Sequence, residues 1–209
     1  MEHDRSLLEQ VIGTEWEMFR TVNGDQYVDC QEDPQTFAGM RAAQFRAWPA
    51  DALRSYADDL ARAKREGRNL LREKYIRMMR STEPENYEIL RRELPEDTPE
   101  KLALTEEIWQ LLLPQTRALR EKYPTVMQGA RPLLIAEENG WSSVEGYQKS
   151  ELMTYSAETL WALLHHIRAL TLEGRSFAAE VEENTVGFYG FQSLQEAEEK
   201  LSARAGERA

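Results

Sequence analysis

Helix start signals recur along almost the whole chain, and they limit its fold more than any other feature. In each signal a capping residue is followed three positions later by an acid, or directly by a proline at the first helical position. No segment of useful length shows the strict alternation of a half-buried strand. The signals are Ser6 with Glu9, Thr82 with Glu85, Ser142 with Glu145, Ser193 with Glu196, Asp33-Pro34 and Thr98-Pro99. The sequence therefore predicts an all-α protein.

We expect a helical bundle of about ten helices in a single domain over residues 1–209. Glycine and proline interrupt the helical pattern at 123–141, and 23–33 also lacks it. Loops of this length in a compact domain are often functional. The expected helices cover 6–21, 34–47, 50–66, 69–81, 84–92, 99–122, 143–154, 157–173, 176–189 and 194–204.

The chain resembles itself when it is shifted by 107 residues. The run Glu66-Gly67-Arg68 then falls on Glu173-Gly174-Arg175, and the order of helix, turn, helix, Gly-Arg break and helix is kept. This pattern predicts an internal duplication, with half-domains at about 6–95 and 99–204 packed around a pseudo-twofold axis. The alternative is that amphipathic helices of similar length resemble one another without common descent.

The charge balance and the missing motifs exclude several function classes. The 37 acidic and 26 basic residues give a net charge of −11, which disfavours nucleic acid and membrane surfaces as partners. There is no apolar run of membrane-spanning length and no signal-peptide pattern, so we expect a cytoplasmic protein. The familiar nucleotide, serine-hydrolase and zinc motifs are absent, and a single cysteine allows no internal disulfide. We therefore expect no metal and no cofactor.

Glu15 lies where the helical pattern calls for an apolar residue. It is at the centre of a stripe made by Leu8, Val11, Ile12, Met18, Phe19 and Val22. Burying a bare carboxylate is costly, so it must be paired, hydrogen-bonded or neutral. One interpretation is a functional acid. The other is a structural acid clamped by an arginine or a tryptophan N–H from another helix.

Gln44 and Glu151 occupy equivalent places in the two proposed halves. Gln44 lies among Phe37, Met40 and Trp48, and Glu151 among Val144, Tyr147 and Tyr155. If these faces meet, both side chains and Glu15 form a polar pocket with Trp48 and Tyr155 as walls. Two acids in one such pocket would separate their pKa values, leaving one proton donor and one acceptor. The alternative is a Gln–Glu hydrogen bond that fixes the helix register.

Three further positions are candidates for the same pocket or for its surroundings. Asn184 lies on an apolar helix face and is a candidate ligand-binding amide. Arg68 follows Gly67 and either completes a helix-ending turn, neutralises the buried acids or binds an anionic ligand. Glu73 and Arg77 stand four apart and predict a surface ion pair.

Cys30 lies in an acidic loop ahead of a helix start. The helix dipole would lower the pKa of its thiol and the neighbouring acids would raise it, so a nucleophilic or redox role is open. His165 and His166 are adjacent and lie off the apolar stripe of their helix, which indicates surface or boundary residues rather than metal ligands.

Several motifs taken together resemble DUF4125, a bacterial family of proteins of unknown function. The resemblance covers about residues 6–200 and implies no established activity. The motifs are Glu15-Trp16-x-Met18-Phe19, Asp29-Cys30-Gln31-x-Asp33, Met40-Arg41-x-x-Gln44-Phe45-x-x-Trp48, Gly67-Arg68-Asn69-Leu70, Glu73-Lys74-Tyr75-x-Arg77-Met78-Met79, Glu151-Leu152-x-Thr154-Tyr155-Ser156 and Asn184-Thr185-Val186.

The leading hypothesis is a protein that binds a small polar or cationic molecule between its halves. In it, Glu15 and Glu151 are candidates for acid–base chemistry, Gln44 and Asn184 orient the ligand, and Cys30 lies at the mouth. The rival hypothesis is a helical interaction module without catalytic activity. A third is a thiol enzyme or sensor that depends on Cys30.

Overall fold

The computed structural model describes residues 2–22, 33–138 and 140–206. These residues form ten α-helices, two short 3-10 helices and no strand, which confirms the all-α prediction. The helices are α1 (Glu2–Phe19), α2 (Pro34–Arg46), α3 (Ala50–Arg65), α4 (Leu70–Thr82), α5 (Pro84–Leu90), α6 (Pro99–Lys122), α7 (Val144–Leu152), α8 (Ala157–Leu172), α9 (Phe177–Phe188) and α10 (Leu194–Gly206). None of the described helices combines the length and the apolarity that crossing a bilayer requires.

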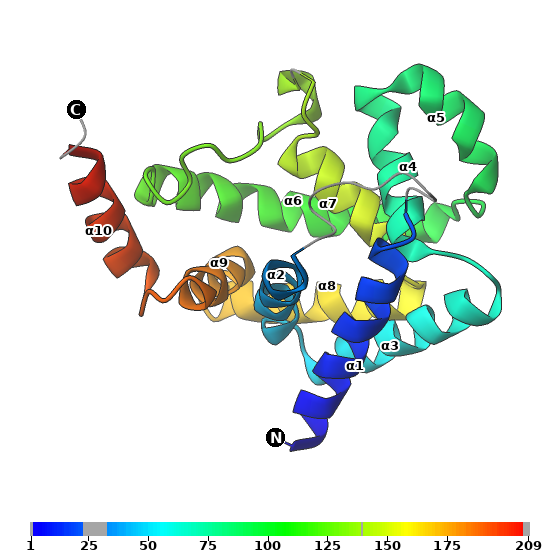
Figure 1. The fold of residues 1–209 in the computed structure, drawn as a ribbon, viewed down its shortest axis with the longest axis horizontal. Helices are drawn as coiled ribbons and strands as arrows, with labels where there is room; N and C mark the ends of the chain where they lie inside the picture. Colours follow the sequence, from blue (N-terminus) through cyan, green and yellow to red (C-terminus); the bar gives the residue numbers. More distant parts are fainter. Residues whose placement is uncertain (1, 23–32, 139, 207–209) are drawn as a thin grey trace.

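The helices pack in pairs around one main core (Figure 1). Helix α8 lies between α3 and α6, while α2 packs on α9 and α4 packs on α7. Helix α10 extends from α9 at one end of the molecule. The residues buried in the main core come mostly from α1, α3, α6 and α8, and the largest include Phe45, Tyr56, Leu60, Ile108, Tyr155, Leu160, Leu164 and Ile167.

Three of the six predicted capping residues are confirmed and three are not. The side chains of Asp33, Thr98 and Ser193 accept the backbone N–H three residues ahead, as predicted. Helix α1 begins at Glu2, before Ser6, so Ser6 lies inside the helix and does not cap it. The hydroxyl of Thr82 donates back to the Met78 carbonyl, so α5 starts after Glu83, with Pro84 in its first turn. Ser143, not Ser142, caps α7 by accepting from the Gly146 N–H.

Two glycine turns end α3 and α8 in the same way. Gly67 and Gly174 have φ values of 69° and 73°, in the left-handed region. The N–H of the following arginine, Arg68 or Arg175, donates to a carbonyl of the last helical turn at 2.8 Å in both places. Both glycines therefore allow the tight reversal that a side chain would strain.

Replacing Gly67 or Gly174 with alanine should lower the free energy of unfolding by about 1–2 kcal/mol each. The matched control is Gly13→Ala in the middle of α1, where no described atom outside the helix's own nearby backbone lies within 4 Å of the added Cβ. That change should raise stability by up to about 1 kcal/mol, since alanine favours a helix. Urea unfolding of the three variants measures these effects. If Gly13→Ala and Gly67→Ala changed the free energy of unfolding in the same direction, this explanation of the turns would be wrong.

Candidate functional site

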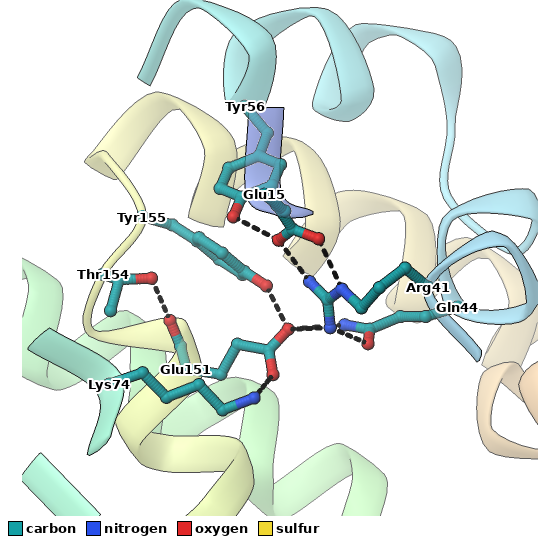
Figure 2. A network of polar contacts seen from close by, with 8 residues as sticks. All are labelled: Glu15, Arg41, Gln44, Tyr56, Lys74, Glu151, Thr154 and Tyr155. Carbon is teal, nitrogen blue, oxygen red and sulfur yellow. Dashed lines mark hydrogen bonds and ion pairs between the residues drawn. The ribbon is translucent and has the colours of Figure 1, made fainter. Parts of the chain in front are cut away.

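Arg41 of α2 joins two buried carboxylates that come from opposite ends of the chain (Figure 2). Its Nε and Nη2 donate to the two carboxylate oxygens of Glu15 at 2.6 Å each. Its Nη1 donates to Glu151 at 2.9 Å and to the amide oxygen of Gln44 at 2.7 Å. Glu15 is fully buried and Arg41 is 7% exposed. A single guanidinium therefore ties α1 to α7 from its place on α2.

Glu151 accepts four hydrogen bonds in this cluster. One oxygen accepts from Arg41, from the amide of Gln44 at 2.9 Å and from the Tyr155 hydroxyl at 2.8 Å. The other accepts from the ammonium of Lys74 on α4 at 2.5 Å. Burial alone would raise the pKa of Glu151, but the charges of Arg41 and Lys74 outweigh it and hold the pKa far below 4.5. Glu151 is therefore ionised near neutral pH.

The donors of the cluster also keep their protons. Burial and the charge of Glu15 raise the pKa of Tyr56, whose hydroxyl donates to Glu15 at 2.6 Å. Burial and Glu151 do the same for Tyr155. Burial lowers the pKa of Lys74, yet attraction to Glu151 leaves it above 10.5. Two cations thus balance two carboxylates.

The structure brings together Glu15, Gln44 and Glu151, which the sequence predicted to converge. Two cations, Arg41 and Lys74, lie beside these acids and hold Glu151 ionised, and the separation into one proton donor and one acceptor stays a prediction. The clamp of Glu15 by an arginine and the Gln44–Glu151 hydrogen bond, both considered as alternatives, are present. Sequence analysis missed Arg41 and Lys74 as members of the cluster.

Trp48 and Tyr155 lie beside this cluster, with ring centroids 5.4 Å apart and planes at 80°. Both are buried, and Tyr155 also packs on Tyr56 with centroids 4.8 Å apart. The rings of these two residues pack beside the polar cluster and fill the space around it. Met40, expected on the same inward face of α2, is 40% exposed, so that expectation is wrong.

Asn184 and Arg68 lie outside the cluster. The Asn184 amide donates to the Ala43 carbonyl at 3.0 Å and fastens α9 to α2. Arg68 donates to both oxygens of Glu73 at 2.8 and 2.9 Å, so it supports the turn before α4. The predicted Glu73–Arg77 surface pair is wrong, because Arg77 is bonded to Asp97 instead.

The remaining sequence candidates are Cys30, His165 and His166. Cys30 lies outside the described residues. His165 is exposed and His166 is half-buried, with Nε2 3.0 Å from the Ala47 carbonyl oxygen, which confirms them as surface and boundary residues. In the part of the chain that the structure describes, no three His, Cys, Asp or Glu residues form a group that could hold a metal ion.

A cleft of about 370 Å³ opens over the two cations of the cluster. Phe19 and Phe37 stack in its wall with centroids 5.0 Å apart. The Lys74 ammonium lies 3.5 Å from the ring centroid of Tyr147. The described lining residues are Phe19, Asp33, Thr36, Phe37, Met40, Arg41, Leu71, Lys74, Tyr75 and Tyr147. We call this space the cation-floored cleft.

Comparison with known proteins gives one match. A family model described as a protein of unknown function, DUF4125, matches residues 5–199. No curated protein and no solved structure matches the chain.

Proposed function

The chain belongs to the DUF4125 family of proteins of unknown function, and we propose that it binds a small organic molecule bearing a carboxylate or a similar anionic group. The site is the cation-floored cleft. The observation that carries the proposal is its charge: the described lining contains two cations, Arg41 and Lys74, and one acid, Asp33. Aromatic walls suit an apolar or planar body on the same ligand.

Lys74 is the residue best placed to recognise the anionic group. Among the described residues its ammonium donates to one oxygen, that of Glu151, although it has three N–H bonds. Tyr147 covers part of it through a cation–π contact. This arrangement leaves donor capacity for an acceptor in the cleft, in a buried setting where a charge-assisted hydrogen bond is strong.

We propose an anionic ligand in place of the cationic one expected from the sequence, because the acids are already bonded. Glu15 and Glu151 are paired with Arg41 and Lys74 and are not among the described lining residues. The same pairing argues against acid–base chemistry. A carboxylate whose pKa is held low is a weak base and cannot donate a proton near neutral pH.

Benzoate should bind in a 1:1 complex at least about tenfold more tightly than benzamide, which has the same shape without the charge. Isothermal titration calorimetry measures both. The exposed rim residue Met40 provides matched variants. Met40→Glu should weaken benzoate binding and Met40→Lys should strengthen it, with benzamide unaffected by either. Equal affinities for benzoate and benzamide would overturn the proposal.

We also infer an internal duplication, which places the site where two halves meet. Three observations support it: α3 and α8 each have 16 residues and start 107 positions apart, α4 and α9 also start 107 apart, and both glycine turns share one hydrogen-bond pattern. Gln44 and Glu151, which are bonded to each other, are separated by the same 107 residues.

Protein interaction is a second candidate function, favoured by an exposed patch on α2 and at the end of α9. Met40, Phe188 and Tyr189 are 40%, 40% and 59% exposed. The Tyr189 hydroxyl lies 3.9 Å from the Met40 sulfur, so these side chains adjoin. Self-association in sedimentation velocity that is abolished by Tyr189→Ser would favour this candidate.

A further inference from the structure

A second, larger hollow lies between α1, α2 and the start of α3, and most of its described lining residues are apolar. Its volume is about 1080 Å³, at the upper end of the range of ligand pockets. Glu9 and Arg46 are the charged residues of its described lining. The others are Leu7, Leu8, Ile12, Gly13, Trp16, Pro34, Phe37, Ala38, Ala42, Phe45, Trp48, Ala50 and Leu53. We call it the apolar groove.

Gly13 is a residue that the packing of the described chain does not explain. It lies in the interior of α1, where glycine weakens a helix relative to alanine. Among the described residues, no atom outside the nearby backbone of α1 lies within 4 Å of the Cβ that another residue would add. Ala38 and Ala42 line the groove from α2. Small side chains on both helices therefore keep a space open that the described residues do not fill.

Phe37 lies between the apolar groove and the cation-floored cleft, because it lines both. Its ring contacts Trp16, a groove residue, with centroids 5.2 Å apart. It also stacks on Phe19, a cleft residue, at 5.0 Å. The cationic floor and the apolar walls thus belong to two adjoining spaces that share one aromatic side chain.

We propose that the ligand is a single-chain amphiphile, with its anionic head in the cation-floored cleft and its apolar chain passing Phe37 into the apolar groove. The inference rests on the proposed function and adds the chemical class of the ligand. The complementarity is of two kinds: charged donors face the head and apolar side chains face the tail. A purely apolar occupant would leave the donor capacity of Lys74 unused.

A chain-length series tests this inference. Butanoate, octanoate and dodecanoate, below their micellar concentrations, are titrated against the protein by calorimetry. Affinity should rise by up to about fourfold for each added methylene that enters the groove. Gly13→Leu, which fills the groove from α1, should weaken octanoate and dodecanoate by at least tenfold and leave butanoate and benzoate unchanged. Gly13→Ala is the matched control and should change none of them by more than about twofold.

The outcomes separate this inference from the proposed function. If benzoate binds but the affinity of the straight-chain carboxylates does not depend on their length, the inference of an amphiphilic ligand is overturned and the cleft remains the proposed site. No binding of any carboxylate would overturn the proposed function itself. If Gly13→Leu fails to fold by circular dichroism, Ala38→Leu fills the groove from α2 instead. A monomer–dimer equilibrium that either variant abolishes would assign the groove to a second copy of the chain and overturn the inference.

Discussion

Replacing Arg41 with methionine should lower the free energy of unfolding by about 3–5 kcal/mol. The guanidinium supplies both bonds to Glu15 at 2.6 Å, and Glu15 is fully buried. Methionine keeps an apolar stem of similar length, so the packing changes little. The variant leaves Glu15 with the Tyr56 hydroxyl and no compensating cation, and an unpaired buried charge is costly.

Urea unfolding at neutral pH measures this loss, with Lys64→Met as the matched control. Lys64 pairs with Glu17 at 2.8 Å, and their side chains are 67% and 65% exposed. Both variants remove a cation from a carboxylate at similar distance, so they differ mainly in burial. The control should show a far smaller loss, because solvent screens an exposed pair. A loss for Arg41→Met as small as that of the control would mean that the buried pairing of Arg41 does not stabilise the fold.

The convergence of Glu15, Gln44 and Glu151 was predictable because each interrupts an apolar helix face. A polar side chain in such a stripe must find a partner in the interior, and the interior of a small protein offers few places. Local periodicity therefore located the cluster without any knowledge of the topology. The helices themselves were predictable for a similar reason, since caps and proline act within one turn.

Arg41 and Lys74 also interrupt apolar helix faces, which is the same signal in a weaker form. Arg41 stands four residues from both Phe37 and Phe45, and Lys74 four from both Leu70 and Met78, so each lies in a partly or fully buried row. Long cationic side chains in such rows usually extend their charge to solvent, which makes the signal weaker than for a short acid. Here both remain inside, because the carboxylates are there.

The hydrogen-bond partners and the cleft could not be predicted from the sequence. Arg41 bridges Glu15 and Glu151 because of the way α1, α2 and α7 pack together. No local sequence pattern predicts that packing. The sequence therefore predicted an acidic pocket, whereas the cations reverse the charge of the lining. The expected cationic ligand followed from the acids alone, and the anionic ligand that we propose follows from the acids together with their partners.

Replacing Glu151 with glutamine should destabilise the protein by about 3–5 kcal/mol at neutral pH, and the loss should shrink in acid. Glutamine still accepts from Tyr155 and Arg41, but it leaves the buried ammonium of Lys74 without a counter-charge. In the wild type the pKa of Glu151 is lower in the folded chain than in the unfolded one. Its contribution is therefore complete at neutral pH and declines as the pH falls below about 4.5.

The two proteins should consequently converge at low pH, since a protonated glutamate and a glutamine are both neutral. Urea unfolding of both between pH 8 and about pH 3.5 gives the difference at each pH. This difference in the free energy of unfolding should be constant above about pH 5.5 and should decrease below about pH 4.5. Glu17→Gln serves as the control, because that acid pairs with Lys64 in solvent and should give a small difference throughout. A difference for Glu151→Gln that stays constant into acid would show that the charge of Glu151, and hence its pairing with Arg41 and Lys74, does not stabilise the fold.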